Sequence, residues 1–461
     1  MAYIWRSRHR IGVIGILNAG KTVFITSLIN HIKHHDPDIL RLRDGKTKIV
    51  FDKEEEPDSG LERFPYAKFR AEAHKVWPEQ TERPSQFKCS FFRTDWKHTT
   101  GDLSIVDIPG ERLCDLPMAA MDFGNWSDWL IDFMMQDREH SYRDLCQEYS
   151  NFLNTLGETT KDPQTAEVAR KQITTRYSAL LVKLAQGFRP IVTPSAFVLS
   201  PEGVHLSDFI FKDDLTRCHT GLDEERAFAP LPSGFRDKNP EIAKAFMKYY
   251  NDYKDKIAEP LNRIFKSCNE LVVVVDVLDL LKCNTAMYNG NRELLGRTID
   301  LLSPGHGFLN NIPRAVVPKK FRNLFRIKSI QRLALVATKA DLVRKEDRPR
   351  IEGLLRQMTR EPVDRLHVTK SNVNCEFFAC SAVRSTENLP DGKIMGAGSM
   401  KNGFRLIEIE PPTVPERWPD SWKEGDFNFK DVSPKFPENA SVPPKHIKMD
   451  SLVDFLLKEI Y

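Results

Sequence analysis

The chain has 461 residues, which is too long for one ordinary hydrophobic core, so we expect two or three structural modules. Apolar residues make up 41% and charged residues 29%, a composition that excludes a disordered or fibrous protein. The 68 basic and 64 acidic side chains leave a net charge of +4, which gives no sign of a nucleic-acid partner. No apolar run is long enough for a transmembrane helix, and the 8 cysteines lack zinc-site spacing, so we expect a cytoplasmic protein with reduced thiols.

An apolar run, Ile11-Gly-Val-Ile14, lies close to the N-terminus and predicts a buried strand. Removal of a signal peptide would destroy this strand, so export is not expected. The run leads into Gly15-Ile-Leu-Asn-Ala-Gly-Lys-Thr22, which has the G-x-x-x-x-G-K-T spacing of a phosphate-binding loop. Helical periodicity follows over residues 22–33, as this loop requires.

This loop predicts a nucleotide site because glycine permits the tight turn in which backbone N–H groups surround a phosphate. Gly15 and Gly20 would supply the turn. Lys21 would reach the β- and γ-phosphates, and Thr22 would place its hydroxyl on Mg²⁺. The other nucleotide-binding candidates here are Asn18, Ala19 and Val23. The competing interpretation is a glycine-rich strand-to-helix turn without a ligand.

Residues 36–84 are polar and show little periodicity, so an irregular segment is expected there. Two strands follow, near residues 87–92 and 103–106, joined as a hairpin. The second runs into Asp107-Ile-Pro-Gly110, a D-x-x-G element. Asp107 would hold Mg²⁺ through water, and the N–H of Gly110 would bond the γ-phosphate and release it after hydrolysis. By itself, the element is also compatible with an ordinary strand-ending turn.

Two roles near this element stay open. A switch threonine should coordinate Mg²⁺ beside Thr22 and Asp107, and Thr81 is the candidate, with Thr47 as the alternative. Glu111 follows Gly110, where many GTPases place glutamine; an ionised glutamate only accepts hydrogen bonds and repels the γ-phosphate. We therefore expect slow hydrolysis, or a water positioned by another residue. The predicted catalytic residues are Lys21, Thr22, Gly110 and Glu111.

A long insertion, residues 111–266, has helical apolar spacing at 126–152, 165–188 and 241–265. Residues 190–240 are rich in proline and charge, and predict loops with short strands. Trp129, Phe133 and Met134 are interpreted as helix-packing core rather than as a cofactor site.

The later strands carry the signal for base recognition. Glu270-Leu-Val-Val-Val-Val-Asp276 predicts a buried parallel strand, and the strand from Arg332 ends in the T-K-x-D residues Thr338, Lys339 and Asp341. The Asp341 carboxylate matches the N1–H and N2–H₂ donors of guanine, which adenine lacks, while the Lys339 stem would cover the purine. A further strand ends in Ser381-Ala382, where the N–H of Ala382 could bond guanine O6.

The remaining segments are less specific. Residues 318–332 form a basic amphipathic stretch, interpreted as a helix packed on the sheet, with contact to an anionic membrane or acidic partner as the alternative. Residues 385–444 predict a small β-rich insertion, and residues 450–461 predict an amphipathic helix that covers the sheet.

The P-loop, D-x-x-G, T-K-x-D and Ser-Ala elements each follow a predicted strand, where a doubly wound sheet builds its ligand site. Their order is similar to that of the translation-factor-related GTPase domain. We therefore predict an α/β fold: a doubly wound, P-loop GTPase-like sheet with a large helical insertion and a small β-rich third domain. The predicted core comprises residues 1–110, 267–384 and 445–461, the helical domain residues 111–266, and the third domain residues 385–444.

A closer resemblance covers almost the whole chain. The chain resembles the bacterial YcjX family in Phe64-Pro-Tyr66, Val76-Trp-Pro78, Asp107-Ile-Pro-Gly-Glu-Arg-Leu-Cys-Asp-Leu-Pro-Met118, Phe197-Val-Leu199, Ala337-Thr-Lys-Ala-Asp341 and Pro415-Glu-Arg-Trp418. This resemblance implies a stress-associated P-loop protein with a GTPase-like core, a helical domain and a third domain. It also implies an inner-membrane protein as a partner, and hence peripheral association with the inner membrane.

Three functions compete at this stage. The leading hypothesis is a GTP-hydrolysing switch that uses GTP, GDP and Mg²⁺, with arginines such as Arg112 as possible charge-stabilising groups. The second is a scaffold that holds nucleotide with negligible turnover, which Glu111 favours. The third is an ATPase of general P-loop type, against which Asp341 argues. Nucleic-acid binding is less favoured, because no aromatic-rich basic groove is evident.

Overall fold

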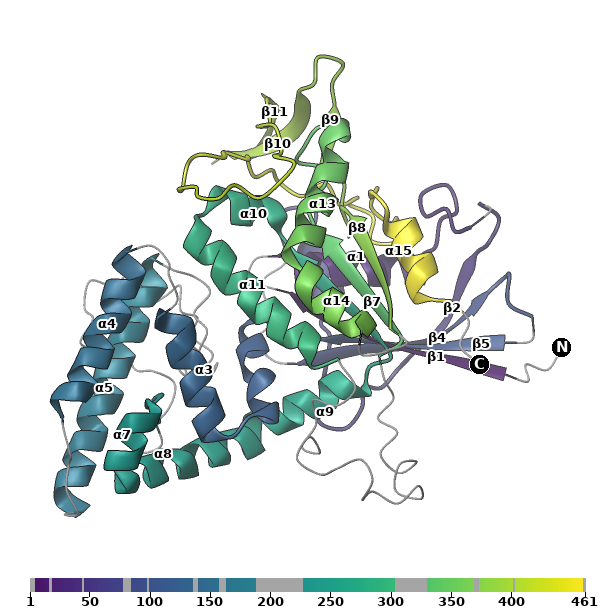
Figure 1. The fold of residues 1–461 in the computed structure, drawn as a ribbon. Helices are drawn as coiled ribbons and strands as arrows, with labels where there is room; N and C mark the ends of the chain where they lie inside the picture. Colours follow the sequence, from purple (N-terminus) through teal and green to yellow (C-terminus); the bar gives the residue numbers. More distant parts are fainter. Residues whose placement is uncertain are drawn as a thin grey trace.

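A computed structural model describes most of the chain (Figure 1). The described residues are 5–15, 19–43, 45–77, 84–97, 99–135, 140–156, 163–187, 227–302, 330–368, 373–400 and 403–458. The structure is a mixed α/β fold with a central, mostly parallel sheet and a small antiparallel sheet. None of the described helices combines the length and apolar character needed to span a bilayer.

The central sheet has 8 strands in the order β2-β4-β5-β1-β6-β7-β8, with β3 paired to β4. Strands β5, β1, β6, β7 and β8 are parallel neighbours, whereas β4 runs antiparallel to both β2 and β5. The predicted hairpin before the D-x-x-G element is therefore confirmed. The strand bounds are β1 Trp5–Gly15, β2 Ile49–Glu55, β3 Glu62–Arg63, β4 Ser85–Arg93, β5 Thr99–Asp107, β6 Glu270–Val275, β7 Arg332–Ala337 and β8 Asn374–Ala379.

Helices cover both faces of this sheet, which explains why β6 is apolar from Leu271 to Val275. Val272 and Val274 join the hydrophobic cluster of α1 and α15, whereas Val273 and Val275 join that of α10, α11, α13 and α14. A strand buried on both sides has no polar face, so its sequence is continuous rather than alternating. The helices are α1 Lys21–Lys33, α10 Val277–Lys282, α11 Thr285–Asp300, 3₁₀ helix η6 Lys345–Asp347, α13 Arg348–Met358, α14 Arg360–Val368 and α15 Met449–Leu456.

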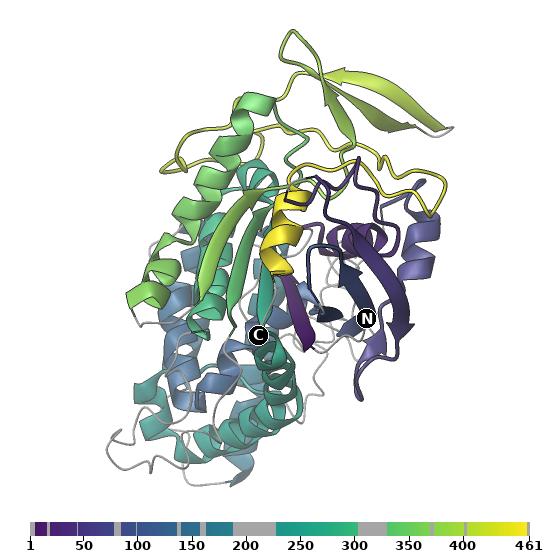
Figure 2. The ribbon, with the colours of Figure 1, turned by 90° about the vertical axis from the view of Figure 1, so that its right-hand side faces the viewer.

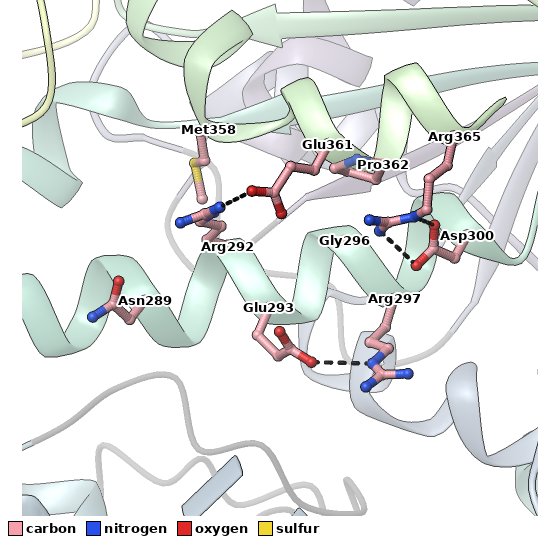
Figure 3. Close-up of a pocket in the computed structure, with 10 residues that line it drawn as sticks. All are labelled: Asn289, Arg292, Glu293, Gly296, Arg297, Asp300, Met358, Glu361, Pro362 and Arg365. Carbon is pink, nitrogen blue, oxygen red and sulfur yellow. Dashed lines mark hydrogen bonds and ion pairs between the residues drawn. The ribbon is translucent and has the colours of Figure 1, made fainter. Parts of the chain in front are cut away.

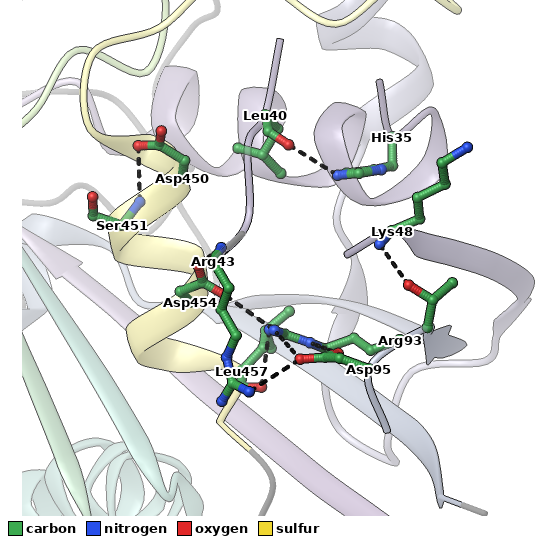
Figure 4. A network of polar contacts seen from close by, with 11 residues as sticks. His35, Leu40, Arg43, Lys48, Arg93, Asp95, Asp450, Ser451, Asp454 and Leu457 are labelled. Atoms are coloured by element: carbon green, nitrogen blue, oxygen red, sulfur yellow. Dashed lines mark hydrogen bonds and ion pairs between the residues drawn. The ribbon is translucent and has the colours of Figure 1, made fainter. Parts of the chain in front are cut away.

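The C-terminal helix α15 is held against the sheet by polar contacts at its last turn (Figure 4). The buried Arg93 guanidinium donates to Asp454 Oδ1 at 3.0 Å and to the Leu457 carbonyl at 3.3 Å. Asp95 neutralises the same guanidinium through two bonds of 3.0 Å each, and Arg43 N donates to Asp454 Oδ2 at 2.6 Å. The predicted return of the C-terminal helix to the sheet is therefore confirmed, and Figure 2 shows it lying across the strands.

The segment 36–84 is not irregular as predicted, because it contains β2, β3 and α2 Tyr66–Glu72. Strand β2 is an edge strand, and its run Asp52-Lys-Glu-Glu55 faces solvent on one side. Natural edge strands often carry charge, which prevents edge-to-edge association but also hides the strand from a search for apolar alternation. A register shift between Phe51 and Lys53 further interrupts the alternation.

The insertion after β5 forms a helical body with its own hydrophobic core, seen beside the sheet in Figure 1. Its centre is a group of buried aromatic rings that includes Trp126, Phe228 and Tyr250, with centroids 5.3–5.6 Å apart. Phe133 and Met134 are buried in this core, as predicted, whereas Trp129 packs at its margin. The elements are 3₁₀ helices η1 Gly110–Asp115 and η2 Pro117–Ala120, α3 Phe123–Met135, α4 His140–Thr155, α5 Pro163–Gly187, α7 Ser233–Lys238, α8 Pro240–Tyr253, π-helix η5 Lys254–Ala258 and α9 Glu259–Ser267.

The predicted β-rich segment contains a three-stranded antiparallel sheet: β9 Thr386–Asn388, β10 Ile394–Met400 and β11 Gly403–Ile409. The chain from 411 to 444 then runs without helix or strand and packs on the core, where Trp418 and Trp422 lie against Tyr288 of α11. Residues 318–329 of the basic stretch and residues 190–226 lie outside the described part of the chain.

Candidate functional site

The carboxyl ends of the parallel strands lie in register at one edge of the sheet. Val13 pairs with Asp107, Gly15 pairs with Val274, and Ala337 pairs with both Val275 and Ala379. The segments that follow these strands therefore leave the sheet at the same edge, which is where ligands bind in open α/β sheets. All four motifs of the sequence follow these strand ends.

Two glycines of the first motif meet requirements that other residues would not meet. A Cβ added at Gly15 would lie 2.3 Å from Val274 Cγ2 and 2.9 Å from the Val274 carbonyl oxygen, so a side chain cannot fit beside β6. Gly20 has φ of 77°, in the left-handed region that favours glycine, and its carbonyl accepts from Phe24 N at 2.9 Å as α1 begins. Asn18 lies outside the described residues, whereas Ala19 is buried beside the start of the helix.

Lys21 and Asp107 form a buried ion pair between α1 and the end of β5. The Lys21 side chain is 10% exposed and the Asp107 side chain is fully buried. Thr22, the next residue of α1, is also buried. The structure thus brings together two predicted site residues, a cation and a carboxylate, at the start of α1, and Thr22 is the next residue of that helix.

The D-x-x-G element continues from this ion pair into η1, which begins at Gly110. Ile108 N donates to the Val13 carbonyl at 3.1 Å and so keeps the element beside β1. Glu111 lies in η1, but its side chain is outside the described part of the structure. Thr81 also lies outside the described residues. The alternative, Thr47, precedes the end of β2 where Ile49 pairs with Arg93, opposite the end where Ser85 pairs with Asp107.

The T-K-x-D element contacts the first motif directly. Thr338 Oγ1 donates to the Ala19 carbonyl at 2.9 Å, which joins the end of β7 to the turn after β1. Lys339 has φ of 57°, and its Nζ lies 2.6 Å from Asp276 Oδ2 at the end of β6. The sequence pattern pointed to Thr338 and Lys339, but Asp276 had no assigned role.

Asp341 is buried, and its carboxylate is oriented by two donors from the loop after β8. Ser381 Oγ donates to Asp341 Oδ1 at 2.7 Å, and Ser385 N donates to Oδ2 at 2.8 Å. Burial raises the pKa of Asp341, and these two hydrogen bonds oppose that rise. Each carboxylate oxygen has a second lone pair, so the side chain can still accept from a ligand.

The Ser-Ala loop is tied both to the first motif's helix and to the C-terminal segment. Ser27 Oγ of α1 donates to the Ala382 carbonyl at 2.6 Å. Ser381 N donates to the Ile447 carbonyl at 3.1 Å, and Ile447 N donates back to the Ser381 carbonyl at 2.8 Å. The positions of Ser381 and Ala382 are thus set by α1 and by a segment far along the chain.

A small apolar cluster lies next to the start of α1 and to the Ser-Ala loop. Val383 and Phe436 are buried together with Ala73, and the partly buried Val23 and Trp77 pack against them. Trp77 Nε1 also donates to the Val432 carbonyl at 2.9 Å. This cluster connects the start of α1, the Ser-Ala loop and the segment that returns from the small sheet.

The family model for the YcjX-like family, DUF463, matches residues 9–460. The chain belongs to this family. The match contains every candidate site residue, so the site is part of the YcjX-like region of the chain and not of an added segment.

Two relatives of this YcjX-like chain are named Ras-like GTPase YcjX. The relative from Shewanella oneidensis is 24% identical over 495 residues, which cover 98% of this chain and 94% of the relative. The relative from Escherichia coli is 25% identical over 477 residues, which cover 98% of this chain and 95% of the relative. The likeness therefore extends through the sheet, the helical body and the small sheet alike.

Sequence reasoning missed several residues that support the site of this YcjX-like chain. Asp276, Ser27 and Ser385 each contact a predicted motif residue, and none stood out by pattern. For Asp276 a signal existed, because it is an acidic residue that directly follows the apolar run Leu271–Val275. Ser27 and Ser385 carried no such signal, since a serine in a helix or loop is ordinary.

A separate cavity of about 510 Å³ lies between α11 and α14, as Figure 3 shows. None of the predicted site residues lines it. Each of its arginines faces an acid: Arg292 with Glu361 at 2.8 Å, Arg297 with Glu293 at 3.0 Å, and Arg365 with Asp300 at 2.8 Å. Its charges are therefore mutually neutralised, and the cavity is separate from the candidate site at the strand ends.

Proposed function

We propose that this protein binds GTP and GDP with Mg²⁺ at the strand-end site and hydrolyses GTP slowly, as a nucleotide-dependent switch on a P-loop GTPase-like fold. One observation carries the proposal: the residues expected for phosphate and those expected for the base meet through the bond from Thr338 to Ala19. Two motifs 319 residues apart in the sequence are therefore in contact, which supports a single site with a phosphate-binding part and a base-binding part. The names of the two relatives support the same function.

The charges around Lys21 fit a magnesium nucleotide. Lys21 and Asp107 neutralise each other in a buried site, and a triphosphate with its metal would offer an anion to the lysine and a cation to the carboxylate. Within the described ranges, no three His, Cys, Asp or Glu side chains are grouped closely enough to hold a metal by themselves. Magnesium commonly combines one or two protein ligands with phosphate oxygens, which matches Asp107 and Thr22 with a nucleotide.

In this proposal, each residue expected to bind the phosphates or Mg²⁺ has one role. The N–H groups from Gly15 to Val23 hold the phosphate oxygens, and Lys21 neutralises charge on the β- and γ-phosphates. Thr22, Asp107 (through water) and Thr81 would hold Mg²⁺, which supplies neutralisation of the phosphate charge when it is bound. Gly110 N–H would bond the γ-phosphate, and its release would shift η1.

The residues expected to bind the base favour guanine because they include the carboxylate of Asp341. Asp341 accepts the N1–H and N2–H₂ donors, which adenine does not have on that edge. Ser381 and Ser385 hold this carboxylate in place before a ligand arrives. The N–H of Ala382 would complete the recognition of guanine at O6. This assignment distinguishes the GTPase from an ATPase of general P-loop type.

We infer slow turnover from Glu111, because an ionised glutamate accepts hydrogen bonds from the attacking water but cannot donate one to it. The competing scaffold hypothesis, which also follows from Glu111, has bound nucleotide and negligible turnover. A role in stress response and peripheral contact with an inner-membrane partner extend the proposal, and they rest on the family resemblance alone.

The decisive experiment is a binding panel of GTP, GDP, XTP, XDP, ATP and ADP with Mg²⁺, measured on the purified chain and on Asp341→Asn. Wild type should prefer guanine nucleotides by at least about a hundredfold, and the variant should shift toward xanthine nucleotides, because an amide matches the altered edge. ATP binding that equals GTP binding, and that does not change in the variant, would refute the base assignment.

Single-turnover hydrolysis of GTP separates the switch from the scaffold. The switch predicts a measurable rate that a membrane fraction can raise, whereas the scaffold predicts no turnover with or without it. Glu361→Gln is a suitable control in both assays, because Glu361 lines the separate cavity and pairs with Arg292 at 2.8 Å.

A further inference from the structure

The Lys339 side chain crosses the carboxyl edge of the sheet. The residue follows β7 with a left-handed backbone, φ 57°, and its Nζ reaches Asp276 Oδ2, 2.6 Å away, at the end of the neighbouring strand β6. Val275, which precedes Asp276, pairs with Ala337 in register. The lysine stem therefore extends from one strand end to the next instead of pointing into solvent.

Asp276 is itself held firmly, so it can fix the lysine. Its side chain caps α10, because Oδ1 accepts from Asp279 N at 2.9 Å. The Asp276 side chain is 3% exposed, whereas the Lys339 side chain is 33% exposed. The carboxylate thus lies beneath the lysine, and the exposed part of the stem lies on the outer side.

The charges around Lys339 and Asp276 favour the ion pair between these two side chains. Burial would lower the pKa of the Lys339 ammonium, but the charge and hydrogen bond of Asp276 outweigh burial and raise that pKa. Asp279 and Asp431 also lie near enough to act on the ammonium. On α10, Lys282 contacts both acids, Asp431 at 3.2 Å and Asp279 at 3.6 Å, so it neutralises part of this negative field.

We propose that Asp276 is a positioning residue for base recognition, which acts by holding the Lys339 stem extended over one face of the purine whose edge Asp341 reads. The inference rests on the proposed guanine-nucleotide site. A free lysine loses considerable rotamer freedom when a ligand orders it, so a lysine ordered beforehand leaves more of the contact free energy for binding. Asp276 would therefore increase affinity without touching the nucleotide.

The test is a double-mutant cycle on GDP affinity in the full chain. Asp276→Asn removes the charge but keeps a side-chain oxygen that caps α10 as well as aspartate does. We expect it to weaken GDP binding about tenfold, the range for losing one ordered side chain. Lys339→Ala should weaken GDP binding by more, because it also removes the methylene cover.

The combined variant decides whether Asp276 acts through the lysine. If it does, Asp276→Asn has no further effect in the Lys339→Ala background. Losses that add, or an Asp276→Asn variant that binds GDP as wild type does, overturn the inference. Affinity for inorganic tripolyphosphate should stay unchanged in Asp276→Asn, whereas a merely structural role would lower it together with GDP affinity.

Two further variants keep the test interpretable. Asp276→Ser retains an N-cap oxygen and replaces Asp276→Asn if that variant does not fold. Glu361→Gln, which removes an exposed ion pair with Arg292 beside the separate cavity, should leave GDP affinity within about twofold. A wild-type chain that binds neither GDP nor GTP refutes the proposed function itself. A wild-type chain that binds GDP, with the same affinity in the Asp276 variants, refutes this inference alone.

Discussion

The two ends of the central sheet both bury charge, but they do so differently. At the carboxyl end, Lys21 meets Asp107 and Lys339 meets Asp276, each at the start of a segment that leaves the sheet. At the amino end of β6, Glu270 Oε1 accepts from His9 Nδ1 at 3.2 Å and lies 3.2 Å from an Arg332 nitrogen. There the charges lie within the strands themselves.

The amino-end group even has the order of a catalytic triad. Ser7 Oγ lies 2.9 Å from His9 Nε2, and His9 Nδ1 contacts Glu270. However, Ser7 is fully buried and Trp96 stacks on the imidazole at 5.8 Å, so no substrate can reach the hydroxyl. Buried charge by itself does not identify a functional site. The difference is one of position: at the carboxyl end the charges lie where segments leave the strands, whereas at the amino end they lie within the strands.

The largest expected effect is at the carboxyl end. Lys21→Ala should reduce GTP affinity about a thousandfold or more, because the phosphates lose their main cationic partner; isothermal calorimetry with Mg²⁺ measures this. Lys33→Ala is the matched control: it is a lysine of the same helix that pairs with Glu54 on the surface at 3.0 Å, and it should bind as wild type does. A folded Lys21→Ala chain with intact GTP binding would contradict the phosphate assignment.

The second expected effect is at the amino end and concerns stability. Glu270→Gln should lower the free energy of unfolding by about 3 kcal/mol, because Arg332 loses its buried anionic partner. GDP affinity should stay within about twofold of wild type. Urea unfolding measures the change, and Glu54→Gln, a surface acid with two basic neighbours, should cost less than about 1 kcal/mol. Loss of nucleotide binding in Glu270→Gln would remove the contrast between the two ends.

The third expected effect is a pH dependence of base recognition. Burial raises the folded-state pKa of Asp341 above its ordinary 3.8, and only the carboxylate accepts the guanine donors. GDP affinity relative to tripolyphosphate should therefore fall as pH decreases through that raised pKa, about tenfold per pH unit below it. In Asp341→Asn the ratio should not change with pH, and a flat wild-type profile would argue against Asp341 as the base reader.

In the nucleotide-free chain, the contribution of Asp341 to the free energy of unfolding depends on pH in the opposite direction. Because the folded state binds its proton more tightly than the unfolded state, the contribution of Asp341 decreases as pH rises from about 3.8 through the raised pKa. Low pH therefore weakens guanine recognition by Asp341, while it favours burial of the Asp341 side chain in the folded chain.

The smallest expected effect is at the junction between the sheet and the helical body. Tyr253 Oη donates to Asp115 Oδ1 at 2.8 Å, and Asp115 is fully buried at the end of η1. Tyr253→Phe should lower the free energy of unfolding by about 1–2 kcal/mol without changing GDP affinity, because a buried carboxylate loses a donor. In the control Tyr149→Phe, whose hydroxyl donates to the neutral Pro230 carbonyl at 2.9 Å, the loss should be smaller. Equal losses would show that the charge of Asp115 is unimportant.

Much of the fold could be predicted from the sequence because its signals are local. The continuous apolar runs of β6 and β7 and the helical spacing of α1, α3, α8 and α15 depend on residues within a few positions of one another. The requirement for glycine at Gly20 is equally local, because it follows from φ of 77°. Gly15, in contrast, must be glycine because Val274 of β6 lies against it, which is a tertiary contact. Edge strand β2 escaped prediction, since its charged residues follow from its place in the sheet and not from its own periodicity.

The motifs, their order and the strands that they follow could be read from the chain alone, which was enough to predict that Lys21, Asp107, Thr338 and Asp341 lie at one edge of a sheet. The contacts between motifs could be seen only in the folded chain: Lys21 with Asp107, Thr338 with Ala19, and Lys339 with Asp276. Such contacts join residues 63 to 319 positions apart, so they depend on strand register and on the packing of both sheet faces, which no short stretch of sequence encodes.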